Sequence, residues 1–364
     1  MKSLKTRPAV GGRSYIFYTV PFIPMLFIVI TTPLCNLHCT YCGGHLPGMP
    51  SEIQYSISDL ADMIGRYKDP VVAFYGGEPL LRPHVITEMI DALPAKRFVI
   101  NTNGYFIKSI ENILSRFDTI LLSIDGRETI TDGYRSPGCY QRVMEAVDCI
   151  KQSNFSGELI ARMTVSRDTD IFEDVTHLLT SFPLVHWQLD VVWSNLWDLA
   201  GFTRWAETSY KPQLRRLINW WIGQVKKGQL KGIIPFLGIM SRLLHGGNGL
   251  PCASGCQSVT VMTDGRILAC PIAPDYEWNV LGTFDQFTPV HIGEPCTSCR
   301  VYPVCGGRCL FSYKEKLWGQ NGFNEICRVT KFLIEELHTH ISDCEPLQEH
   351  FRYPPYNNTT EIIP

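Results

Sequence analysis

Three cysteines near the N-terminus have a spacing that suits an iron–sulfur cluster. Cys35, Cys39 and Cys42 form a C-x3-C-x2-C triplet on one short stretch of the 364-residue chain. Three thiolates on one loop can hold three corners of a [4Fe–4S] cube and leave the fourth iron open to an outside ligand. A zinc site normally needs a fourth protein ligand, which His38 or His45 could supply. The triplet alone therefore leaves iron–sulfur and zinc chemistry open.

Eight further cysteines gather in the C-terminal third of the chain. The first three are Cys252, Cys256 and Cys270. A C-x2-C-x5-C-x3-C run follows, formed by Cys296, Cys299, Cys305 and Cys309, and Cys327 stands alone after it. Eight thiolates are enough for two fully ligated [4Fe–4S] clusters. A pair of four-cysteine zinc sites, or one zinc ribbon over 296–309, is the alternative.

Several polar residues downstream of the triplet could bind a charged ligand. Gly76 and Gly77 allow close approach of a backbone, and the next residue, Glu78, can accept hydrogen bonds from an ammonium group. Arg135 carries a planar fork that can pair with a carboxylate through two bonds. A glycine turn with a solvated glutamate is the plain alternative for the first group. Arg162 is a weaker candidate for the same carboxylate contact, and Gln188 and Asp190 could line the cavity. A structural role is an equal alternative for these three residues.

These residues follow predicted strands. Strand-like runs alternate with amphipathic helical stretches, the strands being Phe27–Thr32, Val71–Tyr75, Arg97–Asn101, Thr119–Ser123, Leu159–Val165 and His186–Val192. The helical stretches are Ser58–Tyr67, His84–Leu93, Ile110–Phe117, Tyr140–Gln152 and Ile171–Ser181. Such alternation predicts parallel βαβ units in a doubly wound sheet or a full or partial barrel. In both folds ligands bind at the carboxyl ends of the strands, so the candidate residues are expected to converge there.

Composition limits the class of protein. Apolar residues make up 45% of the chain and the net charge is −2, which argues against a nucleic-acid partner. The apolar run from Tyr15 to Leu34 resembles a signal peptide or membrane anchor, but three prolines interrupt it and its β-branched half favours a buried strand. We therefore expect a cytoplasmic protein with no membrane partner, whose fourteen cysteines are metal ligands or reactive thiols rather than disulfides.

The motifs resemble those of a known enzyme family. The segment Cys-Asn-Leu-His-Cys-Thr-Tyr-Cys at 35–42 resembles the radical S-adenosylmethionine (SAM) signature, with the aromatic Tyr41 before its last cysteine. Gly-Gly-Glu-Pro at 76–79, Asn103 after the third strand and Ser-Ile-Asp-Gly at 123–126 resemble further elements of that family. The C-terminal cysteine spacing resembles its SPASM accessory domain, and the whole chain resembles peptide-modifying radical SAM enzymes of archaea.

The resemblance implies three [4Fe–4S] clusters and S-adenosylmethionine as cofactors. The cofactor would contact Tyr41, Gly76, Gly77, Glu78, Asn103, Ser123 and Arg135, the last two at its carboxylate. The open cluster would use Cys35, Cys39 and Cys42. By the relatives' ligation, the first auxiliary cluster would use Cys252, Cys256, Cys270 and Cys309. The second would use Cys296, Cys299, Cys305 and Cys327. The resemblance leaves the residue that acts as general base unassigned.

The implied fold is a partial (βα)6 TIM-like barrel followed by a small cysteine-rich α+β SPASM domain. The expected divisions are an N-terminal extension (1–14), the barrel (15–195), a helical linker (196–250), the SPASM domain (251–341) and a tail (342–364). The implied function is hydrogen abstraction from a peptide or protein by a 5′-deoxyadenosyl radical, in an oxidoreductase or peptide maturase supplied with electrons by a ferredoxin or flavodoxin. Such chemistry is typical of anaerobic organisms.

Alternatives stay open at this point. They are a radical enzyme for a small molecule or cofactor precursor, a non-catalytic electron carrier and, more distantly, a zinc-bound module. Two departures from the family pattern matter. The cluster loop begins at Cys35, which leaves no room for an N-terminal leader-binding domain. Pro271 stands where sulfatase-maturating relatives have an aspartate base, which argues against formylglycine formation by their mechanism.

Overall fold

The computed structural model describes residues 24–43, 48–192, 196–247, 249–358 and 362–364. The expected N-terminal extension and the first part of the apolar run lie outside the described residues. Within the described part, no helix is long and apolar enough to cross a membrane.

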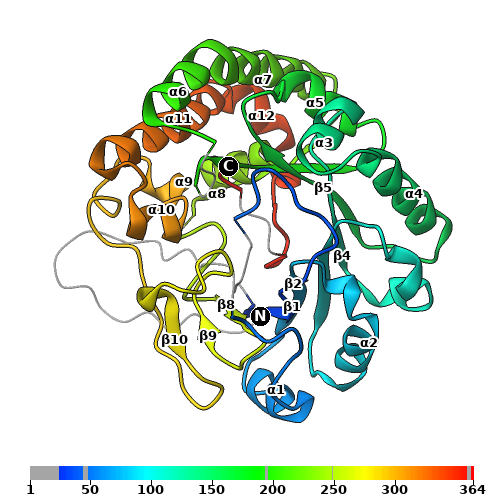
Figure 1. Ribbon diagram of the computed structural model, residues 1–364. Coiled ribbons are helices and arrows are strands. Elements are labelled where there is room, and N and C mark those ends of the chain that lie inside the picture. Colours follow the sequence, from blue (N-terminus) through cyan, green and yellow to red (C-terminus); the bar gives the residue numbers. More distant parts are fainter. Residues whose placement is uncertain (1–23, 44–47, 193–195, 248, 359–361) are drawn as a thin grey trace, which may run out of the picture.

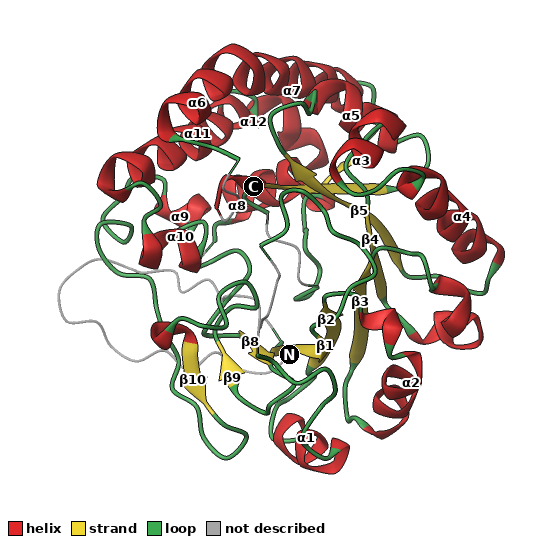
Figure 2. Cartoon of the chain, viewed as in Figure 1, coloured by secondary structure: helices red, strands yellow, loops and turns green. Residues whose placement is uncertain are grey.

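A ten-stranded sheet forms the inner layer of the molecule, and helices surround it as an outer ring (Figures 1 and 2). Its first six strands pair in parallel and in chain order: β1 Leu26–Thr32, β2 Val71–Gly76, β3 Arg97–Thr102, β4 Thr119–Ser123, β5 Glu158–Val165 and β6 Leu184–Leu189. The six predicted strands and their parallel order are confirmed. The sheet runs from β10 to β7 as an open series, as expected for a partial barrel.

The first strand shows why the apolar run belongs to a sheet. Leu26, Phe27 and Val29 are fully buried, and β1 lies between β2 and β8. β-branched side chains on both faces suit a parallel strand that is covered on both sides. The strand interpretation of residues 26–32 is therefore confirmed.

The helices after the strands match the predicted pattern closely. In the barrel they are α1 Ile57–Ile64, α2 Pro83–Ala92, α3 Glu128–Tyr134, α4 Cys139–Gln152 and α5 Ile171–Leu178. The stretch predicted at 110–117 belongs instead to a 3-10 segment, Ile107–Arg116. Side-chain caps fix two of the starts, since Ser56 accepts from the Asp59 amide and Asp170 accepts from Phe172 and Glu173.

Beyond β6 the chain forms a helical layer and then rejoins the sheet. The remaining elements are α6 Leu199–Trp205, α7 Lys211–Val225, β7 Gly232–Ile233, α8 Ile234–His245, β8 Ser258–Val261, β9 Ile267–Leu268, β10 Val280–Gly282, α9 Tyr302–Cys305, α10 Leu310–Glu315, α11 Gly319–His338 and α12 Ile341–Cys344. Trp205, Tyr210 and Trp221 are buried in the core. β8 pairs in parallel with β1, so the cysteine-rich region begins by extending the barrel sheet.

Several of the described residues after 342 are buried, although their composition predicts a tail at 342–364. Phe351 is fully buried with its ring centroid 6.0 Å from that of Trp221, and Ile362 and Ile363 are 2% and 1% exposed. Composition misled here because proline and asparagine are typical of tails, yet these asparagines are buried and hydrogen-bonded. Figure 1 places the C end of the chain near α8, inside the ring of helices.

Candidate active site

The cysteine triplet lies on the loop that leaves the carboxyl end of β1. Cys35 and Cys42 are exposed and Cys39 is half-buried. The loop turns tightly, because the Cys42 amide donates to the Cys39 carbonyl at 3.0 Å and the Thr40 amide donates to the Tyr134 carbonyl at 2.8 Å. Burial raises the pKa of the Cys39 thiol to about 12, Arg135 lowers it, and nearby Cys42 and Cys35 add to the rise. The three sulfur atoms are thus close enough to act on one another electrostatically.

Gly76 and Gly77 bring the loop after β2 against this cysteine loop. The Gly77 amide donates to the Thr32 carbonyl at 3.0 Å, and the Glu78 amide donates to the Leu34 carbonyl at 2.8 Å. A Cβ on Gly76, whose φ is +148°, would lie 2.2 Å from the Thr32 oxygen, and one on Gly77 would lie 2.3 Å from the Leu34 oxygen. The close approach that glycine permits is therefore made to the chain itself.

Glu78 is a buried carboxylate that joins two strand ends. Its Oε1 accepts from the Leu80 amide at 2.9 Å and the Thr102 hydroxyl at 2.6 Å, and its Oε2 accepts from the Asn103 amide at 2.7 Å. The side chain of Asn103 in turn donates to Asn36 Oδ1 at 2.8 Å, within the cysteine loop. Glu78 and Asn103 thus hold the ends of β2 and β3 beside the triplet.

Burial raises the pKa of Glu78 from about 4.5 to about 7, against the lowering effect of its three hydrogen bonds. When the pKa of a carboxyl group is higher in the folded than in the unfolded protein, its protonation adds to the free energy of unfolding. This contribution is complete at a pH below the unfolded-state pKa, and it is lost as the pH rises through the folded-state pKa. We expect the unfolding free energy of the wild type, relative to Glu78→Gln, to fall by about 2–3 kcal/mol between pH 4.5 and 8. Urea unfolding of both proteins at several pH values measures this difference. A difference that stays constant or grows with pH contradicts the assignment.

Asp125, within the Ser-Ile-Asp-Gly segment at 123–126, is the centre of a buried network that the sequence does not predict. It accepts from the Tyr41 hydroxyl at 2.6 Å and from the Thr164 amide at 2.9 Å, and it is fully buried. Arg135 donates to both of its carboxylate oxygens, from Nε at 2.8 Å and from Nη2 at 2.7 Å. The network attaches Tyr41, and with it the adjacent Cys42, to the end of β4.

This arrangement bears on the role expected for Arg135, which stays a prediction. The resemblance implies that the Arg135 guanidinium, together with Ser123, binds a ligand carboxylate. In the structure two nitrogen atoms of this guanidinium donate to Asp125. The reason is that Asp125 follows Ser123 by two residues and offers a desolvated carboxylate of matching geometry. Arg162 is instead the register partner of Ser123 across β4 and β5, and its guanidinium lies 2.6 Å from His186 Nδ1.

The candidates on β6 and beyond it are less closely tied to the triplet. Gln188 lies opposite Thr164 on β5. Asp190 begins the short 3-10 turn after β6 and accepts from the Ser166 hydroxyl and the Trp197 indole, both at 2.7 Å. These contacts give Asp190 a structural role at the strand end.

Four of the C-terminal cysteines lie close together. Burial raises the pKa of Cys296 to about 12, and nearby Cys327, Cys305 and Cys299 raise it further. Burial likewise raises the pKa of Cys305 to about 11, with Cys327 and Cys299 contributing. This grouping is the one that the resemblance implies for the second auxiliary cluster.

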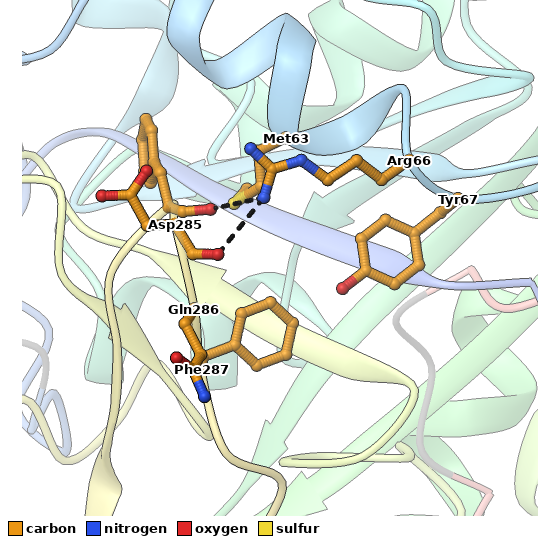
Figure 3. Close-up of a pocket in the computed structure, with 7 residues that line it drawn as sticks. Met63, Arg66, Tyr67, Asp285, Gln286 and Phe287 are labelled. Carbon is orange, nitrogen blue, oxygen red and sulfur yellow. Dashed lines mark hydrogen bonds between the residues drawn. The ribbon is translucent and has the colours of Figure 1, made fainter.

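A defined cavity of about 220 Å³ lies away from this site, between α1 and the turn at 284–287 (Figure 3). Arg66 spans it and donates to the Phe284 carbonyl at 3.1 Å and the Asp285 carbonyl at 3.4 Å. Its residues provide no cysteine or buried carboxylate. Across the described residues, no three His, Cys, Asp or Glu side chains converge as a single-ion site requires.

The sequence of the barrel matches the model of a known protein family. The sequence model of the Radical SAM superfamily matches residues 29–179. These residues form a radical SAM domain. The domain contains the cysteine triplet, the Gly76–Glu78 loop, Asn103, Asp125 and Arg162. Radical SAM domains bind a [4Fe–4S] cluster with S-adenosylmethionine, and a loop presenting three neighbouring thiols, two of them exposed, fits such a cluster.

Curated relatives fall into two groups, one matched over most of its length and the other over less than half. The cysteine-type anaerobic sulfatase-maturating enzyme of Clostridium perfringens is 24% identical over 83% of this chain and 92% of its own. The 7-carboxy-7-deazaguanine synthase of Methanothermobacter thermautotrophicus is 33% identical over 28% of this chain. The AdoMet-dependent heme synthase of Methanosarcina barkeri is 27% identical over 41%. The chain spans less than half the length of these last two relatives, 42% and 46%.

Solved radical SAM structures share the fold. The chain named anSMEcpe, with bound AdoMet and Kp18Cys peptide, superposes with a TM-score of 0.72 at 17% identity over 88% of this chain and 99% of that chain. SuiB of Streptococcus suis, bound to precursor peptide SuiA, gives 0.54 at 16% identity over 80% of this chain and 72% of that one. The likeness extends beyond residues 29–179, so the fold of the C-terminal region is shared as well.

Proposed function

We propose that this protein is a radical SAM enzyme that removes a hydrogen atom from a peptide or protein substrate. The observation that carries the proposal is the three-thiol loop at the end of β1, held against Glu78 and Asn103 within a radical SAM domain. With a [4Fe–4S] cluster and S-adenosylmethionine bound, such a domain supplies a 5′-deoxyadenosyl radical.

The chain's own residues bind and orient the cofactors. Cys35, Cys39 and Cys42 would hold the cluster, and the Asp125 network would fix the loop through Tyr41. Gly76, Gly77, Glu78 and Asn103 form the wall next to that loop. Since Asp125 takes the fork of Arg135, the cofactor carboxylate is assigned to Ser123 and its register partner Arg162.

The C-terminal cysteines would hold two auxiliary clusters. The mutual pKa effects among Cys296, Cys299, Cys305 and Cys327 support one four-thiolate set. The other set would be Cys252, Cys256, Cys270 and Cys309. Their role would be to pass substrate electrons onward, and a ferredoxin or flavodoxin would reduce the first cluster. With these clusters the chain would bind about twelve irons.

A peptide substrate is favoured because the relative matched over most of its length is a sulfatase-maturating enzyme, and because the two structural neighbours described above have peptides bound. A small-molecule substrate is the second candidate. The observation in its favour is that the 7-carboxy-7-deazaguanine synthase and the AdoMet-dependent heme synthase match 28% and 41% of this chain.

The test uses the reconstituted holoenzyme with dithionite and S-adenosylmethionine under anaerobic conditions. We expect formation of 5′-deoxyadenosine, whereas its absence in a protein that retains a reducible cluster would contradict an enzyme and favour an electron carrier.

A second experiment distinguishes the substrate classes. An extract of cells grown in deuterated medium is separated by dialysis, and each fraction is added to the enzyme. Deuterium in 5′-deoxyadenosine from the retained fraction supports a peptide or protein; deuterium from the dialysable fraction alone supports a small molecule.

A further inference from the structure

Arg308 carries a buried positive charge in the cysteine-rich region. The residue is only 6% exposed. Its Nε donates to the main-chain oxygen of Pro364 at 2.7 Å, and its Nη1 lies 3.4 Å from the Ser312 hydroxyl. Among the described residues, its Nη2 has no hydrogen-bond partner. Because a buried cation is costly without a counter-charge, this position favours a negatively charged group beside the guanidinium.

The backbone at Arg308 is unusual for an arginine. Its φ is +56°, in the left-handed region that costs energy for a residue with a side chain. Gly306 and Gly307, directly before it, also have positive φ, at +61° and +93°. A third glycine would suit this turn better, so the strained position indicates that the arginine side chain has a role of its own.

Arg242, on α8, reaches the same region from the other side. Its Nη1 donates to the Val304 carbonyl at 2.9 Å and to the Gly249 carbonyl at 3.0 Å. Val304 directly precedes Cys305, a predicted ligand of the second auxiliary cluster. Gly249 lies three residues before Cys252, a predicted ligand of the first. The guanidinium of Arg242 therefore joins the two stretches of chain that carry these ligands.

Both guanidinium groups act electrostatically on predicted ligand thiols. Burial raises the pKa of Cys305 to about 11, and a main-chain hydrogen bond and the charge of Arg308 lower it. Burial also raises the pKa of Cys327, against the lowering effect of Arg308. Burial lowers the pKa of Arg242, whereas nearby Cys305 and Cys252 raise it. The arginines thus lie close to the thiols that would become cluster ligands.

This charge arrangement fits a cluster with four thiolate ligands. Such a cluster carries a net negative charge, which grows when it takes up an electron, and net charge is one of the factors that set its potential. A guanidinium remains protonated at any working pH. Its positive charge therefore stabilises the reduced cluster more than the oxidised one, and it does so more strongly in the protein interior than in water.

We propose that Arg308 and Arg242 raise the reduction potential of the second auxiliary cluster, which is assigned to Cys296, Cys299, Cys305 and Cys327. Reduction adds one electron and neither forms nor breaks a bond. In turnover this electron is the one that the substrate loses after hydrogen abstraction, so the arginines make the cluster a better electron acceptor. The inference rests on the proposed function, because it requires the auxiliary clusters.

The test is a potentiometric titration of the full reconstituted chain with dithionite, followed by electron paramagnetic resonance. The reduction step that is missing in Cys296→Ala belongs to the second auxiliary cluster. We expect Arg308→Gln to lower the equilibrium constant of this step at least tenfold, which is about 59 mV for one electron. Arg308→Lys keeps the charge and should retain most of the wild-type potential. A potential that is the same in Arg308→Gln and Arg308→Lys overturns the proposal.

The matched control is Arg300→Gln. Arg300 directly follows the predicted ligand Cys299, but its side chain is 75% exposed and pairs with Glu335. Water and salt screen an exposed charge, so its removal should leave the potential unchanged. A shift in Arg300→Gln as large as that in Arg308→Gln contradicts a specific effect of the buried arginines.

Arg242→Gln repeats the test with residues 305–309 unchanged, so it applies even if Arg308→Gln fails to bind the cluster. It should lower the same potential, and an unchanged potential overturns the role of Arg242. Iron analysis separates this inference from the proposed function. A wild type with about four irons instead of about twelve contradicts the auxiliary clusters and this inference together. About twelve irons, with one potential shared by the wild type, Arg308→Gln and Arg242→Gln, overturns this inference alone.

Discussion

We expect Cys39→Ala to abolish formation of 5′-deoxyadenosine and to remove about four irons per chain. Cys39 is the middle ligand of the predicted open cluster, and two remaining thiolates on the loop cannot hold the cube. Iron analysis of the anaerobically reconstituted variant, together with a chromatographic assay for 5′-deoxyadenosine, measures both effects. The expected iron content falls by a third, because the two C-terminal clusters keep their own ligands.

The matched control is Cys149→Ala. Cys149 is a half-buried cysteine on α4 and belongs to no predicted ligand set. Its replacement should leave the iron content and the rate of cofactor cleavage unchanged. If Cys39→Ala retains full iron, or if Cys149→Ala loses as much, the assignment of the triplet is wrong.

Asp125→Ala has the second large expected effect, on stability. It leaves the Arg135 guanidinium buried without its carboxylate, since the Arg135 side chain is only 8% exposed and that of Asp125 is 0%. Breaking a buried ion pair from one side costs about 3–5 kcal/mol of unfolding free energy. Urea unfolding of the apoprotein measures the loss. The double variant Asp125→Ala/Arg135→Met should regain part of it, because no unpaired charge then remains.

Asp91→Ala serves as the control for this prediction. Asp91 pairs with Arg116 at 3.0 Å on the surface, with side chains 65% and 47% exposed. Such a pair contributes about 0–1 kcal/mol. A loss in Asp125→Ala no larger than that in Asp91→Ala would show that the Tyr41–Asp125–Arg135 network does not hold the cysteine loop in place.

Most of the barrel could be predicted from sequence because each strand is a short β-branched run followed by an amphipathic stretch. Local pattern is sufficient for β1–β6 and for the cysteine loop after β1. It does not predict contacts between distant residues. The bidentate pair of Asp125 with Arg135 joins the segment after β4 to the C-terminal end of α3, and no spacing rule distinguishes it from a ligand-binding arginine.

The C-terminal part shows the same limit at a larger scale. Residues 351–358 carry the proline and asparagine that predict a tail, but their partners Thr119, Glu158 and Gln257 lie 100–237 positions away. Likewise, β8 joins the sheet at β1 through pairing across more than 200 residues. Only the three-dimensional arrangement reveals that the cysteine-rich region and the barrel share one sheet.

The central claim is that the iron held near Cys35, Cys39 and Cys42 has an open position for S-adenosylmethionine. Electron paramagnetic resonance of the dithionite-reduced protein, recorded with and without S-adenosylmethionine, tests it most directly. The account predicts that the cofactor changes the signal of one cluster, and that this cluster is missing in Cys39→Ala. A spectrum that the cofactor leaves unchanged in the fully reconstituted wild type would contradict it.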